Sequence, residues 1–246
     1  MTQTQKRPKP RSWILQFTNL WYNSSMAIEA IIFDMDGLLV DSEPVWDKAR
    51  RSMAAEAGKE WNERDHKAVM GVSTQEWVSY MIQRLELTIS PDEVQEEIVH
   101  RMLEMYRERV PYLPGAIDAV NLASGHYPTA LASGSHPNLI KAVVNDAPMQ
   151  GKFQVVVSAD DVGAGKPAPD VYLQTARRLG VPPQQCLCLE DSGNGILAGL
   201  HAGMKVVAVP DPRFAPTQDI LGQAHLVLNS LEVFSLETIR QLGVSQ

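Results

Sequence analysis

In its second half the chain alternates short apolar runs with amphipathic segments, and few folds accommodate that rhythm. Four apolar runs lie at residues 128–133, 153–158, 186–190 and 205–209. Helical patterns follow the first three runs, and a loop follows the fourth. Strands that alternate with helices in this way are typical of a mostly parallel sheet covered by helices on both faces. We therefore predict an α/β fold with a Rossmann-like, parallel-sheet core.

An earlier apolar run at residues 28–33 has no strand-like neighbour of its own, so it most simply joins the later sheet. Residues 44–112 carry apolar side chains at spacings of three and four, which predicts a helical cap inserted after the first strand. Two prolines in the segment 110–115 mark the end of this insertion. The predicted divisions are a flexible N-terminal extension at 1–27, a core at 28–43 and 113–246, and the cap at 44–112.

The composition is that of an ordinary soluble globule. Of 246 residues 44% are hydrophobic, and the formal net charge is −7. A negative chain has no general attraction for nucleic acid or for an anionic membrane, and no apolar stretch approaches the roughly 18 residues of a membrane span. Cys186 and Cys188 share one apolar run and are too close for an ordinary disulfide, which favours a reducing, cytoplasmic location. We expect a monomer.

The first 25 residues contain Lys and Arg but no acidic residue, and their short apolar patch cannot serve as a secretory signal. A disordered tail is one interpretation, and an upstream stretch from a misplaced start, with Met26 as the true first residue, is another. We favour these two, and import into an organelle stays open.

Chemically active side chains follow the predicted strands, at the edge where parallel sheets bind their ligands. They are Asp34 and Asp36 after the first strand, Ser133 and Gly134 after the second, Lys166 beyond the third, and Glu190 with Asp191 after the fourth. Crowded carboxylates repel one another unless a cation lies between them, and oxygen ligands suit Mg²⁺. Magnesium in turn favours a phosphate group on the substrate. We therefore expect a small phosphorylated metabolite as the partner.

Four short motifs, DMDG, ASGS, GKPAPD and EDSGNG, occur in this order along the chain. Together they are specific, and the chain resembles the haloacid dehalogenase superfamily in the branch with a helical cap after the first strand. Through DGLLVDSEPVW and GKPAPDVY it is most similar to β-phosphoglucomutase-like and 2-deoxyglucose-6-phosphate phosphatase-like proteins. The resemblance implies the same fold and reaction class.

The resemblance also implies catalytic roles, with which the side-chain chemistry agrees. Asp34 is the expected nucleophile, which attacks phosphorus and forms an aspartyl phosphate. Asp36 is the expected general acid and base, and its presence separates phosphatases from dehalogenases of the superfamily. Ser133, Gly134 and Lys166 are expected to bind the phosphate oxygens.

The same resemblance implies a set of magnesium ligands. Asp34 and Asp191 would bind the ion through their side chains, and Asp36 through its backbone carbonyl. Glu190 would act directly or through water.

Each of these residues has a structural explanation when it is taken alone. An Asp pair after a strand is commonly part of a turn, and Ser133 could cap the next helix. Lys166 could be a solvated loop charge, and Glu190 with Asp191 could cap a helix. Because four such coincidences on successive strand ends are improbable, the joint pattern favours catalysis.

Substrate specificity is expected in the predicted cap, at Trp46, Thr74 and Arg101. The β-phosphoglucomutases place a histidine twelve residues after the nucleophile and an arginine in the cap loop, where this chain has Trp46 and Thr74. A mutase must hold a sugar bisphosphate at both ends, so the loss of that arginine argues against a mutase. Arg101 could contact a sugar or a second phosphate.

The leading hypothesis is a magnesium-dependent phosphatase of small phosphate monoesters, such as hexose or hexitol phosphates. The alternative is a β-phosphoglucomutase. A hypothesis of another class is a non-catalytic module that binds a partner protein. The intact Asp34, Asp36 and Lys166 disfavour this module, since it needs neither a nucleophile nor an acid.

Overall fold

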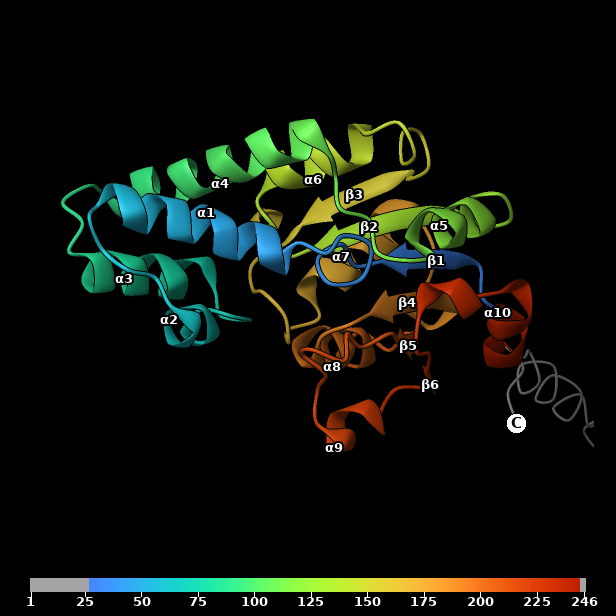
Figure 1. Ribbon diagram of the computed structural model, residues 1–246. Coiled ribbons are helices and arrows are strands. Elements are labelled where there is room, and N and C mark those ends of the chain that lie inside the picture. The colour runs from blue at the N-terminus through green and yellow to red at the C-terminus, as the bar shows by residue number, and fades with distance from the viewer. Residues whose placement is uncertain (1–26, 244–246) are drawn as a thin grey trace, which may run out of the picture.

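The computed structural model describes residues 27–243, which form a six-stranded parallel sheet between two layers of helices (Figure 1). The strands are β1 (Ala30–Phe33), β2 (Thr129–Ser133), β3 (Val155–Ser158), β4 (Cys186–Glu190), β5 (Lys205–Ala208) and β6 (Leu226–Val227). Their order across the sheet is β3-β2-β1-β4-β5-β6, and every neighbouring pair is parallel. The predicted α/β fold is confirmed.

Strand β1 lies at the centre of the sheet because both of its faces can be buried. Ile31 and Phe33 face one apolar cluster, whereas Ala30 and Ile32 face the other. A strand buried on both sides appears in sequence as a continuous apolar run. The strand begins at Ala30, two residues after the predicted start.

Helices cover both faces of the sheet, as predicted. The first cluster includes residues of α5 (Ala116–Ser124), α6 (Pro137–Asn145) and α10 (Leu236–Gly243). The second includes residues of α7 (Asp170–Leu179), α8 (Gly193–His201) and α9 (Gln218–Leu221). The carboxyl ends of the strands therefore meet at one edge, which the helices flank.

The sixth strand was not among the predicted elements. Strand β6 has two residues, and it pairs only with β5. So short a segment has no detectable periodicity, and its strand conformation depends on the neighbouring edge that receives it.

The segment predicted to be helical forms four helices, and α1 follows the carboxyl end of β1 (Figure 1). These are α1 (Glu43–Glu56), α2 (Glu63–Ala68), α3 (Thr74–Leu85) and α4 (Pro91–Glu108). The last three begin with capping boxes, in which Asn62 pairs with Asp65, Ser73 with Glu76 and Ser90 with Glu93. The division into core and cap at the predicted residues stays a prediction. The predicted extension, apart from Ala27, lies outside the described residues.

Both cysteines lie in β4, where they are buried and unpaired. The prediction that they form no disulfide is confirmed.

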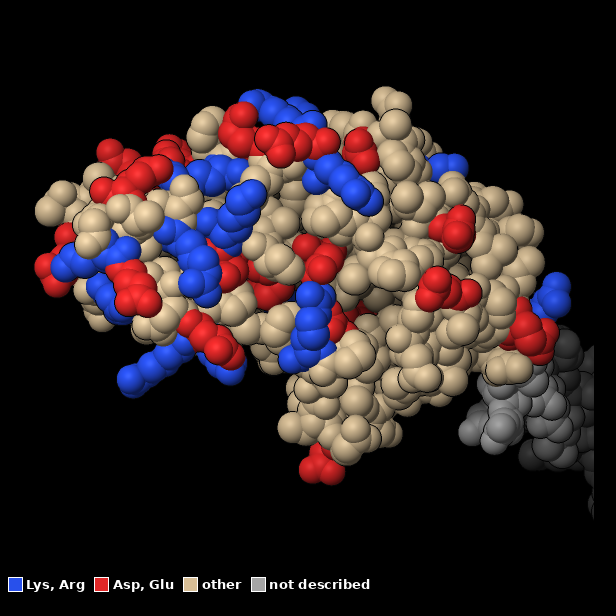
Figure 2. Space-filling model, viewed as in Figure 1, with Lys and Arg blue, Asp and Glu red and all other residues tan. Residues whose placement is uncertain are grey.

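Charged side chains of both signs are interspersed over α1–α4 on the face shown in Figure 2, and the opposite end of that face is largely uncharged. Because the signs are mixed, this face carries no extended basic surface of the kind that binds nucleic acid. No helix among the described residues is long and apolar enough to cross a membrane.

Candidate active site

Lys166 connects two carboxylates that come from neighbouring strands. Its Nζ donates hydrogen bonds to Asp34 Oδ1 and to Glu190 Oε1, each at 2.5 Å, and a third to the carbonyl oxygen of Ala132 at 3.3 Å. Burial opposes the lysine charge, but the carboxylates of Asp34 and Glu190 outweigh it and raise the pKa of Lys166. Lys166 is therefore a charged, partly buried group.

Asp34 directly follows β1 and is 5% exposed. Burial raises the pKa of Asp34 to about 8, and the Lys166 ammonium offsets this only in part, while Glu190 and Asp36 add to the rise. An acid in this position loses its proton more readily when a cation lies close by, so the local charge controls its nucleophilicity.

Glu190 is fully buried, and both of its oxygens accept hydrogen bonds. Oε1 accepts from Lys166 at 2.5 Å and from Tyr172 Oη at 2.6 Å. Oε2 accepts from the backbone nitrogens of Asp191 and Ser192 at 3.2 and 3.3 Å, and from Ser192 Oγ at 3.1 Å. Glu190 therefore holds Lys166 and the loop after β4 in position.

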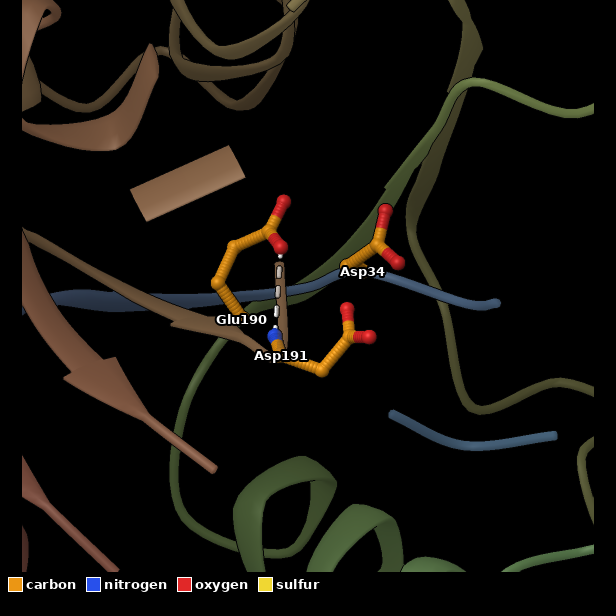
Figure 3. Close-up of side chains that lie close together, drawn as sticks. All are labelled: Asp34, Glu190 and Asp191. Atoms are coloured by element: carbon orange, nitrogen blue, oxygen red, sulfur yellow. Dashed lines mark hydrogen bonds between the residues drawn. The ribbon is translucent and has the colours of Figure 1, made fainter. Parts of the chain in front are cut away.

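The carboxylates of Asp34, Glu190 and Asp191 converge. One oxygen of each lies within 4.8 Å of the others. Figure 3 shows Asp34 and Asp191 with their carboxylates close together, whereas Glu190 turns toward the backbone nitrogen of Asp191. Loops that are more than 150 residues apart in sequence thus meet at the carboxyl ends of adjacent strands.

This donor set fits Mg²⁺. Three carboxylates face a single ammonium, and Asp191 Oδ1 is buried without a hydrogen-bond partner among the described residues. Burial, followed by the charges of Glu190 and Asp34, raises the pKa of Asp191 well above its usual value. A divalent cation would satisfy the free oxygen and relieve the repulsion.

Two glycines allow this close packing. Gly37 has a φ of +78°, and a Cβ placed there would lie 2.2 Å from Asp191 Oδ2. A Cβ at Gly195, in α8, would lie 1.9 Å from the carboxyl carbon of Glu190. Any larger residue would therefore displace a carboxylate of the site.

Asp36 faces the loop that follows β2. Its Oδ2 accepts hydrogen bonds from Ser135 Oγ at 2.6 Å and from Ser133 Oγ at 3.2 Å, while the backbone nitrogen of Ser135 donates to Ser133 Oγ at 3.0 Å. The other oxygen, Oδ1, is buried and has no hydrogen-bond partner within residues 27–243. Gly134, between the two serines, is exposed. The predicted phosphate-binding loop thus lies against Asp36.

The predicted cap residues lie in three different settings. Trp46 packs edge-to-face on Trp77, with ring centroids 5.7 Å apart. Thr74 begins α3 and is half-buried. Arg101 forms hydrogen bonds and ion pairs with Ser52, Glu56 and Glu97, and none of these contacts reaches the carboxylate cluster.

The sequence model of the haloacid dehalogenase-like hydrolases matches residues 28–203, which contain all of the clustered carboxylates. The chain belongs to this family. Its relatives include hexitol phosphatase B of Escherichia coli (strain K12), which is 36% identical over 196 residues, or 76% of this chain and 88% of the relative. Fructose-1-phosphate phosphatase of the same organism is 34% identical over 179 residues, or 73% and 95% of the two chains.

A solved structure of a β-phosphoglucomutase from Clostridium difficile matches with a TM-score of 0.72 and 27% identity, covering 88% of this chain and 97% of that one. This haloacid dehalogenase-like hydrolase is therefore an enzyme with the fold of that branch. With phosphatases among its relatives, it is a phosphoric monoester hydrolase.

Several buried or half-buried residues of this hydrolase were not predicted to be functional. Tyr172, inside the motif GKPAPDVY, donates a hydrogen bond to Glu190. Glu43 and Arg50 of α1 and Tyr106 of α4 are buried or half-buried. Glu43 lies inside the quoted DGLLVDSEPVW, whereas nothing in the sequence distinguished Arg50, because charged residues on a helix are usually solvent-facing.

Proposed function

We propose that this hydrolase is a magnesium-dependent phosphatase of sugar or sugar-alcohol monophosphates that acts through an aspartyl phosphate. The observation that carries the proposal is the position of Asp34, between the ammonium of Lys166 and the carboxylate of Asp191. The hexitol phosphatase and the fructose-1-phosphate phosphatase among its relatives support the substrate class.

In the first step a carboxylate oxygen of Asp34 attacks phosphorus and the bond to the substrate alcohol breaks. Asp36 donates a proton to the departing oxygen, and its free Oδ1 is suited to this task. In the second step Asp36 takes a proton from water, whose oxygen attacks the phosphoryl group. Inorganic phosphate leaves and Asp34 is regenerated.

Three groups would bind the phosphate oxygens during both steps. Ser133 Oγ and the backbone of Gly134 lie on the loop beside Asp36, and Lys166 lies beside Asp34. Preorganised donors of this kind act where negative charge develops in the transition state. Glu190 keeps Lys166 aimed at that position through its own hydrogen bonds.

The residues that would hold Mg²⁺ are Asp34 and Asp191 through their side chains and Asp36 through its backbone carbonyl. The ion supplies positive charge that lets an anionic nucleophile approach an anionic phosphate. Both oxygens of Glu190 are occupied by protein donors, so it would act on the ion indirectly.

The test is phosphate release from a panel of hexose and hexitol phosphates, measured with and without Mg²⁺. We expect Asp34→Asn to lower turnover at least about a thousandfold, since the amide is no nucleophile. Asp118→Asn, at an exposed position of α5, is the matched control and should leave turnover unchanged. Unchanged turnover in Asp34→Asn would exclude the mechanism.

A β-phosphoglucomutase is the second candidate, favoured by the structural match to that enzyme. It would convert β-glucose 1-phosphate to the 6-phosphate in the presence of a bisphosphate primer. Trp46 and Thr74, where the mutases have histidine and arginine, speak against it.

A further inference from the structure

A second polar cluster lies in the cap, and its residues share one face of α1. Glu43, Asp47 and Arg50 are spaced four and three residues apart, so their side chains project in the same direction. His66 of α2 approaches from the other side, with Nε2 3.6 Å from Glu43 Oε1 and Nδ1 3.3 Å from Asp47 Oδ1. Arg50 Nη1 lies 3.9 Å from Glu43 Oε1.

Arg50 is 4% exposed, and two indoles hold its guanidinium in place. The guanidinium carbon lies 4.9 Å from the ring centroid of Trp46 and 5.5 Å from that of Trp77. Such stacking fixes the plane of the guanidinium while leaving its N–H groups free to donate.

The buried polar atoms of this cluster are incompletely paired. Arg50 Nε and Nη1, Glu43 Oε1, Asp47 Oδ1 and His66 Nδ1 have no hydrogen-bond partner among the described residues. Buried polar groups without partners destabilise a protein, and so many in one place point to a function. The 3.9 Å between Arg50 and Glu43 is too long for a hydrogen bond.

The cluster lies close to Asp36, because α1 begins at Glu43, three residues after Val40, and Val40 forms a bridge with Asp36. Burial raises the pKa of Glu43, the charges of Asp36 and Asp41 add to the rise, and Arg50 opposes it. Tyr106 Oη, on α4, is also buried without a partner among residues 27–243, and the charge of Asp36 adds to the rise in its pKa that burial causes. Glu43 therefore lies near Asp36, the acid that would protonate the departing alcohol.

We propose that Glu43 and Arg50 form the subsite that recognises hydroxyl groups of the substrate alcohol. The inference rests on the proposed phosphatase function and names its substrate class, a monophosphate whose remaining part is a neutral, hydroxyl-rich chain. Trp46 and Trp77 are positioning residues, since they hold Arg50. Glu43 and Arg50 are specificity residues.

The chemistry of the pair selects a hydroxyl. A guanidinium only donates hydrogen bonds and a carboxylate only accepts them, whereas a hydroxyl does both. One hydroxyl between Arg50 and Glu43 would satisfy both groups, and a second on the adjacent carbon would reach the remaining N–H. A phosphate dianion cannot donate to Glu43.

The local charge also disfavours a second phosphate. Arg50 faces Glu43, Arg51 pairs with Asp47 at 2.6 Å, and Asp36 lies close by, so the carboxylates outnumber the guanidinium groups. Burial lowers the pKa of His66, the charges of Arg50 and Arg51 add to this, and Asp47 opposes it, so the imidazole adds little positive charge at neutral pH. A sugar bisphosphate would bring two more negative charges to this place.

The test compares sorbitol 6-phosphate, which is rich in hydroxyls, with p-nitrophenyl phosphate, whose leaving group has none. We expect Arg50→Met to lower kcat/KM for sorbitol 6-phosphate by about tenfold or more and to change that for p-nitrophenyl phosphate by less than about twofold. Arg107→Met, which removes an exposed arginine of α4 that pairs with Glu104, is the matched control and should spare both values.

Because Arg50 is buried, Arg50→Met could fail to fold, and a second variant keeps the proposal testable in that case. Glu43→Gln keeps the shape of the side chain and should show the same split between substrates. Across a set of deoxy analogues of the sugar phosphate, at least one missing hydroxyl should cost the wild type about tenfold more than it costs Glu43→Gln. Equal costs in the two proteins would overturn the subsite.

The remaining outcomes separate the two proposals. A wild-type enzyme that releases phosphate from none of these compounds overturns the proposed function. A wild type that hydrolyses both substrates, with Arg50→Met affecting them alike or not at all, overturns only the subsite. A preference for a bisphosphate that Arg50→Met abolishes also overturns it, because Arg50 then binds a phosphate.

Discussion

Lys166, which is partly buried, and Arg50, which is buried, are both cations beside carboxylates, yet their surroundings shift the two pKa values in opposite directions. Lys166 donates short hydrogen bonds to Asp34 and Glu190, and these carboxylates raise its pKa. Arg50 lies 3.9 Å from Glu43, and burial lowers its pKa to about 10 because the carboxylates of Glu43 and Asp47 compensate only in part. Lys166 is paired within the protein, whereas Arg50 Nε and Nη1 lack hydrogen-bond partners among residues 27–243.

The two cations differ in pairing because different secondary-structure elements position the residues around them. The core residues lie at the ends of adjacent strands whose register is set by backbone hydrogen bonds, so short distances between them are maintained. The cap residues lie on helices that pack through side chains, which leaves room for a further group. A phosphoryl group is common to all substrates, and the alcohol varies. The rigid core site is suited to binding the phosphoryl group, and the incompletely paired cluster on the helices is suited to binding the alcohol.

The largest expected effect separates the two cations directly. Lys166→Met should lower the free energy of unfolding by about 3–5 kcal/mol, because it leaves two buried carboxylates without their partner, and should reduce kcat at least about a hundredfold. Arg50→Met should cost no more than about 1 kcal/mol, because the charge it removes is poorly paired. Urea denaturation of both variants measures the difference, and equal losses would contradict it.

A second, intermediate effect concerns pH and magnesium. Asp34 has a folded pKa of about 8 against an ordinary 3.8, so the folded state holds this proton more tightly than the unfolded state. The stabilisation that Asp34 contributes is therefore complete below about pH 4 and is lost as the pH rises to about 8. With EDTA, the melting temperature should fall across this range.

Magnesium should reverse that loss. At an Mg²⁺ concentration about a hundred times Kd, the melting temperature near pH 8 should rise by about 5–10 °C, and the rise should be smaller near pH 5. Thermal scans with Mg²⁺ or EDTA at both pH values measure this. Asp191→Asn removes a proposed ligand, so a shift as large as in the wild type would argue against the assigned ion site.

The smallest effect tests the cap alone. Ser90→Ala removes half of the capping box at the start of α4 and should cost about 1 kcal/mol in urea denaturation, with kcat/KM unchanged. Ser79→Ala, at an exposed position inside α3, is the matched control and should be close to neutral. A change in kcat/KM for Ser90→Ala would show that the cap transmits strain to the catalytic centre.

Much of the fold could be predicted because it depends on local patterns. The apolar run before Asp34 predicts a strand buried on both faces, and the alternation after Gly115 predicts a parallel sheet. The starts of α2, α3 and α4 follow capping residues that can be read directly. Strand β6 could not be predicted, since two residues become a strand only when the edge of β5 receives them.

Some residues of the site could also be predicted from the sequence, and others could not. Asp34, Asp36, Lys166 and Asp191 could be singled out because strand ends of a parallel sheet share one edge. Their roles in catalysis stay a proposal that the experiments above test. Arg50 could not be singled out, because charged residues on an amphipathic helix normally face water, and Glu43 was noted only as part of the motif DGLLVDSEPVW. Arg101, singled out as a substrate contact, pairs with Glu56 and Glu97, and its contact with the substrate stays a prediction.

The sequence alone predicted the sheet, the helical insertion and the loops that carry carboxylates, because hydrophobic periodicity and the ends of strands are local properties of a chain. Only the folded molecule decided which charges are paired and which are not. Glu190 is fully hydrogen-bonded and Arg50 is left short of partners. Pairing depends on distances between segments remote in sequence, and packing, not pattern, sets those distances.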